Sequence, residues 1–535
     1  MNHNYNEDYQ YDSCVSQGIC SINPRTSSLQ EVLVLYLKLT AFYTLRLYKK
    51  GINDKKAKNI ILDTISVMVS NYDFSEKDFK LLVQRFNKIL PILIKKFELN
   101  CANDDTIPEC LKLVLKFCNN TNIIKAIQLG EKEFLRKSQS LSTEIRDLYK
   151  IIFVLVKSIC INILDLETFE NEKYANKVEE GYLTILNTLD NLDAKEESEN
   201  EIKNCISEIA KIDDCLMKTL LLAREEYYGK QRTKEVSYTT TPAKAVLVVG
   251  SNIKELEDVL EVLKDEDIDV YTHDEMVLAN TYPYFEKYPR LKGQYGQGIE
   301  NCLLDFATFP GPIILTKHSL YNVEHLYRGL LFTTDFASSK GIIQIKNKDF
   351  SEVIKSAKNA KGFKTGRQCE SVLLGYDYDE ILNNIKKRIN KYSRIFIIGL
   401  GAYTLEQKSY FEKLLEQVPE DVLVLTLSYC LKRENVICVN ACFDTYAITK
   451  FAKGIKKETK LPISIFFPKC DRHTISQIMY LTTLKDFDIH VGKCAPIILN
   501  PNMIVTLKKV FGINGLTSVK KDLDEILMNK NDKSN

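Results

Sequence analysis

The hydrophobic period of the chain changes near residue 235, and this change constrains the fold more than any other feature. From residue 27 to about 230, apolar residues recur every three or four positions, with few glycines or prolines between them. That period is typical of amphipathic helices. After residue 235, short apolar runs alternate with helical segments, which is typical of α/β folds. We therefore predict an all-α helical bundle domain over residues 1–236, followed by α/β domains.

The helical half can be divided by its turn signals. Ser27 and Ser28 are candidate N-caps, and Glu31 follows Ser28 at the spacing of a capping box. Gly51, which comes after two lysines, is a typical helix-ending residue. The helices expected here cover residues 27–50, 55–70, 75–98, 108–117, 121–137, 141–165, 171–193 and 198–228.

The second half contains the same unit twice. "KAVLVVGS" is a short buried strand that ends in a glycine turn, and a helical segment and the strand "IDVYTH" follow it. "SRIFIIGLG" begins a second unit of this kind, which continues into "DVLVLTLS". The repeat predicts two doubly wound, Rossmann-like α/β domains, over residues 237–366 and 367–535. Neither glycine turn has the full dinucleotide-binding pattern. Ligands gather beyond the carboxyl ends of strands in such folds, and the residues expected there are Ser251, Glu275, Ser319, Gly401 and Cys430.

Composition excludes several classes of protein. Lys plus Arg (73) and Asp plus Glu (71) nearly balance, so no basic surplus attracts nucleic acid or an anionic membrane. The 15 cysteines are odd in number and irregularly spaced, which argues against a disulfide framework and favours reduced thiols. No signal peptide is recognisable, and the apolar run 151–164 contains Lys157 and is too short for a bilayer. We expect a cytoplasmic protein without nucleic-acid or membrane partners.

Two cysteines in the early segment "CVSQGIC", Cys14 and Cys20, raise the possibility of a metal site. Four thiolates would hold an iron–sulfur cluster or a structural zinc, and this pair would supply two of them. The alternative is a loop that binds nothing. Cysteines elsewhere in the helical half are interpreted as packing residues, because free cysteine behaves as a small buried hydrophobe.

The segment "VYTHDEMVLANTYPYFEKYPRLKGQYGQGIENCLLDFATFPGPIILT" resembles the hybrid cluster proteins, also called prismane proteins or hydroxylamine reductases. That family runs "VYTHGEM", "GNYG" and "FPGPI" in the same order and at near-identical spacing. "DFSEVIKSAKNAKGF", "DVLVLTLSYC" and "CFDTY" also match. The resemblance covers nearly the whole chain and implies a prismane-like fold, with a helical domain followed by two α/β domains.

The resemblance also implies a chemistry. Family members carry an N-terminal four-cysteine iron–sulfur cluster and a hybrid iron–sulfur–oxygen cluster. With an electron donor protein, they reduce small N–O compounds such as hydroxylamine and nitric oxide, which implies a role in nitrosative stress. Cys14 and Cys20 look like the later pair of N-terminal ligands. Residues 1–13 contain no cysteine, so the earlier pair is missing.

Most ligands of the hybrid cluster differ from the family pattern. By resemblance, the family histidine falls at Ser251, one cysteine at Ser319 and the persulfide cysteine at Gly401. Another cysteine falls at Tyr429, with Cys430 next to it. The family's last glutamate and lysine fall at Asp471 and His473. Only Glu275 and Cys442 keep the expected residue.

Three functions remain open on this basis. The first is a degenerate family member that binds or scaffolds and has lost or altered reductase activity. The second is an active iron–sulfur oxidoreductase with a divergent cluster, in which Glu275 and His473 are the catalytic candidates. The third is a reused single metal or small-ligand site. The residues that could converge in that third case are Glu275, Cys430, Cys442, Cys470, Asp471 and His473.

Overall fold

The structure is a computed structural model, and its helices and strands follow the change of period seen in the sequence. It describes residues 24–68, 74–101, 107–117, 122–192, 198–296, 302–319, 330–336, 341–401, 405–428, 430–441, 444–468, 472–492 and 501–528. The chain divides into two compact units, with the boundary between Leu220 and Leu221, inside a long helix. Among the described residues, no helix combines the length and the apolar character needed to cross a membrane.

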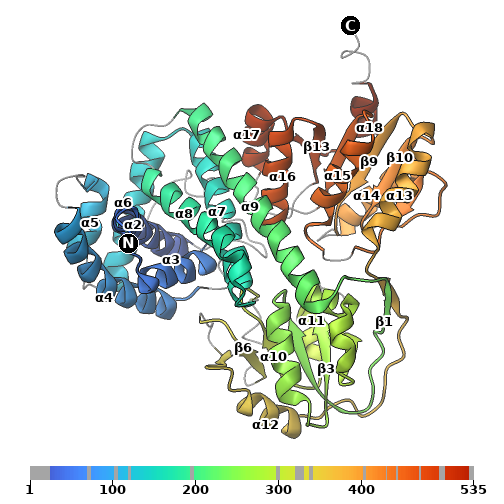
Figure 1. The fold of residues 1–535 in the computed structure, drawn as a ribbon, viewed down its shortest axis with the longest axis horizontal. Helices are drawn as coiled ribbons and strands as arrows, with labels where there is room; N and C mark the ends of the chain where they lie inside the picture. Colours follow the sequence, from blue (N-terminus) through green and yellow to red (C-terminus); the bar gives the residue numbers. More distant parts are fainter. Residues whose placement is uncertain are drawn as a thin grey trace, which may run out of the picture. The chain divides into compact units, whose positions relative to one another are not determined.

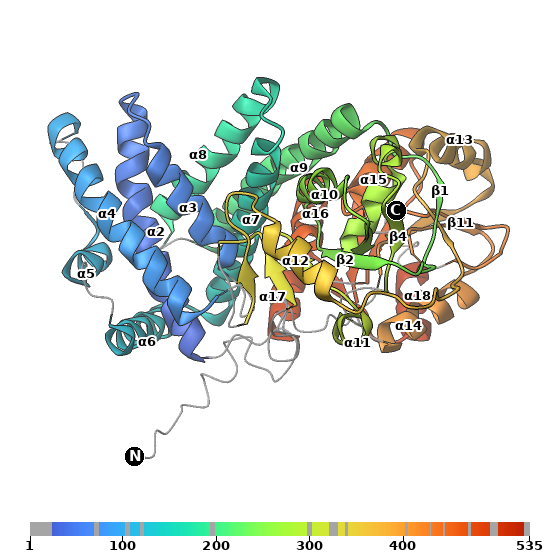
Figure 2. The ribbon, with the colours of Figure 1, turned by 90° about the horizontal axis from the view of Figure 1, so that it is seen from below.

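The first unit is helical. Its helices are α2 (Pro24–Lys49), α3 (Lys55–Val67), α4 (Glu76–Asn100), α5 (Glu109–Phe117), α6 (Ile123–Ser140), α7 (Thr143–Glu167), α8 (Ala175–Asn191) and the first part of α9 (Glu199–Tyr228), with the short 3-10 helix η1 (Glu172–Tyr174) before α8. α2 is buried on nearly all sides from Val32 to Leu45. It packs against α3, α4, α5, α6 and α8, and Figures 1 and 2 both draw it among these helices.

Small and polar residues set details of this bundle. A Cβ on Gly130 of α6 would lie 1.9 Å from the carbonyl oxygen of Ser28 in α2, so glycine allows these two helices to approach closely. The predicted cap at Ser28 is wrong. α2 already includes Pro24, and the Ser28 hydroxyl lies within it and donates to the Pro24 carbonyl (2.9 Å). The predicted end at Gly51 is confirmed, since α2 stops at Lys49 and Gly51 has φ +77°.

The second unit contains two parallel sheets of the same topology. The first has the order β4-β3-β2-β5-β6-β7 and the second β11-β10-β9-β12-β13-β14, each with six strands in the described residues. In both, the order reverses next to the first strand of the sheet. That reversal defines the switch point where ligands bind in doubly wound folds. The two switch points lie between β2 and β5 and between β9 and β12.

The strands are short and mostly fully buried, which explains why they read as continuous apolar runs. Figure 1 shows α10, α11 and α12 around the first sheet. That sheet is formed by β2 (Lys244–Val249), β3 (Ile268–His273), β4 (Leu291–Gln294), β5 (Ile313–Leu315), β6 (Leu331–Thr333) and β7 (Ile343–Gln344), with α10 (Ile253–Leu263), α11 (Cys302–Thr308) and α12 (Ser351–Asn359). Two 3-10 helices, η2 (Asp274–Thr281) and η3 (Pro283–Lys287), follow β3.

The second sheet has the same character. Its core includes Phe396, Phe411 and Phe466, all buried. The strands are β9 (Arg394–Ile398), β10 (Val422–Thr426), β11 (Val436–Cys438), β12 (Ile463–Phe467), β13 (Phe487–Val491) and β14 (Asn514–Gly515). The helices are α13 (Tyr378–Arg388), α14 (Leu405–Gln417), α15 (Ala447–Glu458), α16 (Arg472–Leu484), α17 (Pro501–Phe511) and α18 (Val519–Met528), with η5 (Ile389–Lys391) after α13.

Two short strands near the predicted domain boundaries run side by side. β1 (Lys234–Val236) pairs antiparallel with β8 (Val372–Leu374). The Thr240 amide also donates to the Arg367 carbonyl (3.0 Å). The multidomain class, helical and then doubly wound α/β, is confirmed. The domain boundaries at residues 236 and 366 stay predictions.

A buried carboxylate fixes α10 to the end of α9 and to η3. Glu257 is 5% exposed and accepts hydrogen bonds from the hydroxyls of Tyr227 (3.2 Å), Tyr228 (3.2 Å) and Tyr284 and from the Lys254 ammonium (2.7 Å). Burial alone would raise the pKa of Glu257, but the Lys254 and tyrosine hydrogen bonds outweigh it, and the pKa is lowered.

Candidate functional site

The first switch point begins at a glycine turn. β2 ends at Val249, and Gly250 follows with φ +121°, a conformation that favours glycine. Ser251 comes next and is half-buried. Asn252 then caps α10, because its side chain accepts the Glu255 amide (3.2 Å). The turn therefore places Ser251 between a buried strand end and a helix N-terminus.

The loop after β5 packs tightly onto this turn. The Thr316 hydroxyl and amide both donate to the Val249 carbonyl (2.9 and 3.0 Å). Ser319 is 7% exposed, and its Oγ lies 3.5 Å from Oγ1 of Thr316. A Cβ on Gly250 would lie 2.1 Å from Ser319 Oγ. The structure thus brings Ser319 against the turn that carries Ser251.

Glu275 follows the neighbouring strand. β3 pairs with β2 in parallel, and η2 begins directly after it at Asp274, which has φ +58°. Glu275 is the second residue of η2 and is half-buried. The carboxyl ends of parallel strands share one edge of a sheet, so Glu275 lies at the same edge as the Gly250 turn.

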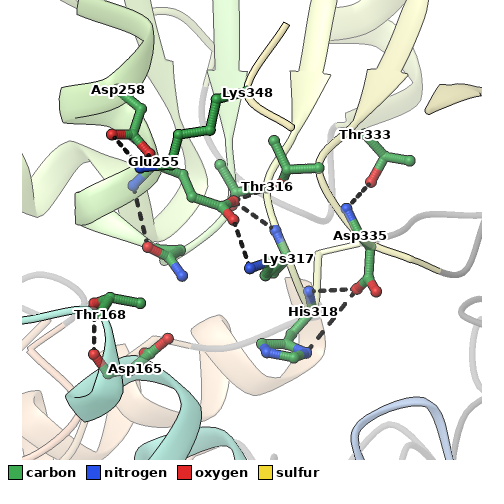
Figure 3. Close-up of polar contacts among 12 residues, drawn as sticks. Asp165, Thr168, Glu255, Asp258, Thr316, Lys317, His318, Thr333, Asp335 and Lys348 are labelled. Carbon is green, nitrogen blue, oxygen red and sulfur yellow. Dashed lines mark hydrogen bonds and ion pairs between the residues drawn. The ribbon is translucent and has the colours of Figure 1, made fainter. Parts of the chain in front are cut away.

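A polar network that the sequence did not predict extends this edge towards β6 (Figure 3). Glu255 is 8% exposed and accepts from the Lys317 amide (2.9 Å) and the Thr334 hydroxyl (2.5 Å). Its other oxygen lies 3.6 Å from the Lys317 ammonium. Asp335, also buried, accepts the His318 amide (2.9 Å), and its Oδ2 lies 4.0 Å from Nδ1 of His318.

This network explains the loop conformation. His318 has φ +64°, which is unusual for a residue with a side chain, and the Asp335 carboxylate fixes its amide. The available signals were a glutamate in the first turn of a helix and an aspartate after a short strand. Neither pattern is specific, so the sequence alone did not indicate the network. Chemically, the edge offers carboxylates and hydroxyls whose oxygens are largely occupied by the protein's own donors.

The second switch point is also organised by a serine. The Ser428 hydroxyl donates to the Gly399 carbonyl (3.0 Å) and accepts the Gly401 amide (2.6 Å). This links the turn after β9 to the end of β10. Gly401 has φ +39°, and a Cβ built there would have nothing within 4 Å. The position assigned by resemblance to a persulfide cysteine is therefore open.

Cys430 differs from the sequence expectation. It was predicted as a metal-binding thiolate, but the structure pairs it with Cys438 in a disulfide. A disulfide sulfur carries no thiolate charge, and the thiolate is the metal ligand. In this form Cys430 is therefore not a metal donor. Its role in a metal site stays a prediction for the reduced chain.

The other predicted site residues are spread more widely. His473 is the second residue of α16 and is half-buried, and its carbonyl accepts from the Gln477 side chain (3.3 Å). Cys14, Cys20, Cys442, Cys470 and Asp471 lie outside the described residues. Within the part of the chain that the structure describes, no three His, Cys, Asp or Glu side chains are grouped to hold a metal ion.

Comparison with known proteins places this chain in a family. The model of the Prismane/CO dehydrogenase family matches residues 10–524. The chain belongs to that family. Its resemblance to hydroxylamine reductases extends over almost the full length of both proteins. The hydroxylamine reductases of Methanococcus vannielii, Clostridium novyi and Acidiphilium cryptum are 26%, 25% and 24% identical, over 98%, 95% and 96% of this chain and 99%, 96% and 96% of theirs.

Solved structures are more distant. Carbon monoxide dehydrogenase IV from Carboxydothermus hydrogenoformans has a TM-score of 0.48 and 11% identity, with 96% of this chain and 91% of that chain covered. The fold class of this prismane-family chain rests on the family match and on its own two sheets.

At the positions that the sequence resemblance assigns to the family's clusters, the donor atoms fit an iron–sulfur cluster poorly. Ser251 and Ser319 supply neutral hydroxyls, which bind iron weakly compared with imidazole or thiolate. Gly401 supplies no side chain, and Cys430 is oxidised. Of the described positions in this assignment, Glu275 alone would keep the ligand type that the resemblance implies.

Proposed function

We propose that this chain is a degenerate prismane-family protein whose cluster sites have lost most of their ligands and whose hydroxylamine- or nitric-oxide-reducing activity is lost or altered. The observation that carries the proposal is Ser319. The family pattern has a cysteine there, and here a serine hydroxyl lies buried against the Gly250 turn, 3.5 Å from Thr316 Oγ1.

The chemistry of ligation supports this reading. Every corner iron of a cluster needs a donor, and the usual donors are thiolates. Hydroxyls at residues 251 and 319 and a missing side chain at residue 401 would leave several irons uncapped. By the family resemblance, Cys14 and Cys20 would supply two of the four N-terminal ligands. We infer that neither family cluster assembles in its usual form.

A folded chain without its clusters suits a binding or scaffold role in the cytoplasm. The family resemblance supplies the expectation for any residual activity: a small N–O compound as substrate and an electron donor protein as partner. Glu275 and His473 are the residues we would assign to proton transfer in that case. Cys442 and Asp471 would be the remaining candidates for metal binding.

Anaerobic reconstitution tests the proposal. The chain and the Clostridium novyi hydroxylamine reductase are purified without oxygen, incubated with iron and sulfide, and passed through gel filtration. We expect the relative to keep several irons and a brown absorbance, and to oxidise a reduced dye when hydroxylamine is added. This chain should keep little iron and show no such oxidation. Several stable irons per chain, with hydroxylamine-dependent dye oxidation, would overturn the proposal.

A gain-of-ligand variant sharpens the test. Combining Ser251→His, Ser319→Cys and Gly401→Cys restores three family donors, so iron retention should rise above that of the unmodified chain. The matched control adds one histidine and two cysteines at exposed positions away from both switch points, as Leu99→His, Ile124→Cys and Leu373→Cys, and should not raise it. Equal iron retention in both variants would mean that the missing donors are not the cause.

A further inference from the structure

The Cys430–Cys438 disulfide lies at the carboxyl edge of the second sheet. Cys438 ends the edge strand β11 and pairs in register with Thr426 of β10, and Cys430 lies in the segment that joins these strands. Two residues before Cys430, Ser428 bonds the Gly401 turn. The bridge thus joins two cysteines at a sequence separation of 8 beside the second switch point.

We propose that Cys430 and Cys438 form a reversible thiol–disulfide exchange site whose reaction partner is a dithiol reductant, either a small molecule or a protein. This inference goes beyond the proposed loss of the clusters and does not depend on it, because it rests on the geometry of one short loop.

The loop keeps its shape without the covalent bond. The Arg433 guanidinium donates to the carbonyls of Leu415 (2.6 Å), Glu416 (3.3 Å) and Val418 (3.0 Å). The Asn435 side chain donates to the carbonyls of Pro419 (3.0 Å) and Val422 (2.9 Å). These contacts fix the backbone between the two cysteines, so the two thiols of the reduced form would stay close to each other.

Preorganisation of this kind favours reversible chemistry. A pair of thiols held together has a high effective concentration, so ring closure competes well with external thiols. Leu431 and Cys438 also pack against the core of the second sheet, and neither contact requires the disulfide. Opening the bond therefore costs little packing, and closing it needs little ordering of the chain.

The two cysteines differ in exposure. Cys430 is exposed and Cys438 is half-buried, so an incoming thiolate reaches Cys430. Attack there forms a mixed disulfide and breaks the bond to Cys438, whose sulfur leaves as a thiolate and takes up a proton. The second thiol of the reductant then attacks the reductant sulfur of the mixed disulfide, and Cys430 leaves as a thiolate. Two electrons pass from the dithiol to the protein, which ends with two thiols, while the reductant ends as a disulfide.

The other described cysteines are not disulfide-bonded, so a reductant has no bond to open there. Cys101, Cys160 and Cys302 are buried, and burial, the largest influence, raises the pKa of the Cys160 thiol. Cys205, Cys215 and Cys369 are half-buried. Among described residues, exchange should therefore concentrate on the Cys430–Cys438 pair.

Differential alkylation of the full chain tests the site. Protein purified without reductant is equilibrated in buffers of varying ratio of reduced to oxidised dithiothreitol, quenched, alkylated and mapped by peptide mass spectrometry. We expect Cys430 and Cys438 to change together from disulfide-protected to alkylated as the ratio rises. Both should become protected again when the ratio is reversed. Far-ultraviolet circular dichroism should stay unchanged. Thiols that label at every ratio, or a bond that opens only in denaturant, would overturn the proposal.

Variants separate exchange from other events. Arg433→Ala should raise the fraction trapped as mixed disulfide with oxidised glutathione several-fold, whereas Lys432→Ala on the neighbouring exposed residue should not. If Arg433→Ala fails to fold, Cys430→Ser tests whether the two cysteines are exchange partners. Cys438 should then be alkylated at every dithiothreitol ratio. The control Cys369→Ser should leave the labelling of Cys430 and Cys438 unchanged. Protection of Cys430 that a metal chelator removes would refute exchange in favour of metal binding. Iron retention by itself bears only on the loss of the clusters.

Discussion

Replacing Gly250 by alanine should destabilise the first switch point more than its small size suggests. The new Cβ would lie 2.1 Å from Ser319 Oγ, 2.3 Å from Thr316 Oγ1 and 2.7 Å from Ser319 Cβ. Both side chains are buried, and Thr316 is tied to the Val249 carbonyl by two hydrogen bonds. Ser319 must therefore move away from the turn by more than an ångström.

Two terms contribute to the free-energy cost. Overpacking of a well-packed site costs about 1–3 kcal/mol. The backbone at φ +121° adds strain of about 1–3 kcal/mol for a residue with a side chain. We expect a total near 4 kcal/mol. Gly512→Ala is the matched control, because Gly512 has φ +72° but nothing within 4 Å of its Cβ, so about 1–2 kcal/mol of backbone strain remains.

Hydrogen exchange measured by mass spectrometry is the suitable assay, because it reports local opening free energies in a multidomain chain. Peptides covering β2 and residues 312–319 should exchange faster in Gly250→Ala, and peptides of the helical unit should not. Adding Ser319→Gly should recover about 1–2 kcal/mol, since it removes two of the three close contacts. A cost for Gly250→Ala no larger than that for Gly512→Ala would refute the placement of Ser319 on the turn.

Two further predictions concern carboxylates that accept hydrogen bonds. Burial would raise the pKa of Asp488, but the hydrogen bond from His490 (2.7 Å) and other partners lower this pKa below its ordinary 3.8. The stabilising effect of the charged carboxylate is therefore complete above that value and is lost as pH falls through the lower folded-state pKa. Asp488→Asn should make stability depend less on pH during acid unfolding monitored by circular dichroism, whereas Asp524→Asn on the surface should not. Glu257→Gln should cost about 2–4 kcal/mol in the exchange of peptides from the end of α9 and η3, because a charged, buried acceptor is lost. Glu261→Gln, with a half-exposed side chain, should cost less than about 1 kcal/mol, and equal costs for the two variants would contradict this account.

The fold could be predicted in outline because its signals are local and periodic. The 3.6-residue period gave the helices of the first unit, and the repeated strand–glycine–helix unit gave both sheets. The end of α2 at Gly51 followed from residue chemistry alone. The start of α2 did not, because a serine with a nearby glutamate fits the interior of a helix as well as its cap. The Ser28 hydroxyl bonds back to the preceding turn, a contact that leaves no trace in sequence spacing.

The site was less accessible to sequence reasoning. The carboxyl edge of the strands could be predicted, and with it the neighbourhood of Ser251 and Ser319. The Glu255 and Asp335 contacts depend on how loops from β5 and β6 fold over α10, which no short pattern specifies. The Cys430–Cys438 bridge was missed for a different reason. An odd cysteine count argues against a disulfide framework, yet it says nothing about a single local pair.

The pairing of β1 with β8 has a genetic consequence. Val236 lies opposite Val372 in the register of the two strands, so the points where the chain enters and leaves the segment 237–371 are neighbours across one ladder. A segment whose two ends meet can be inserted, exchanged or deleted while the flanking chain closes over a short gap. The two sheets share one strand order, so exchanging this segment would exchange a complete sheet of that order.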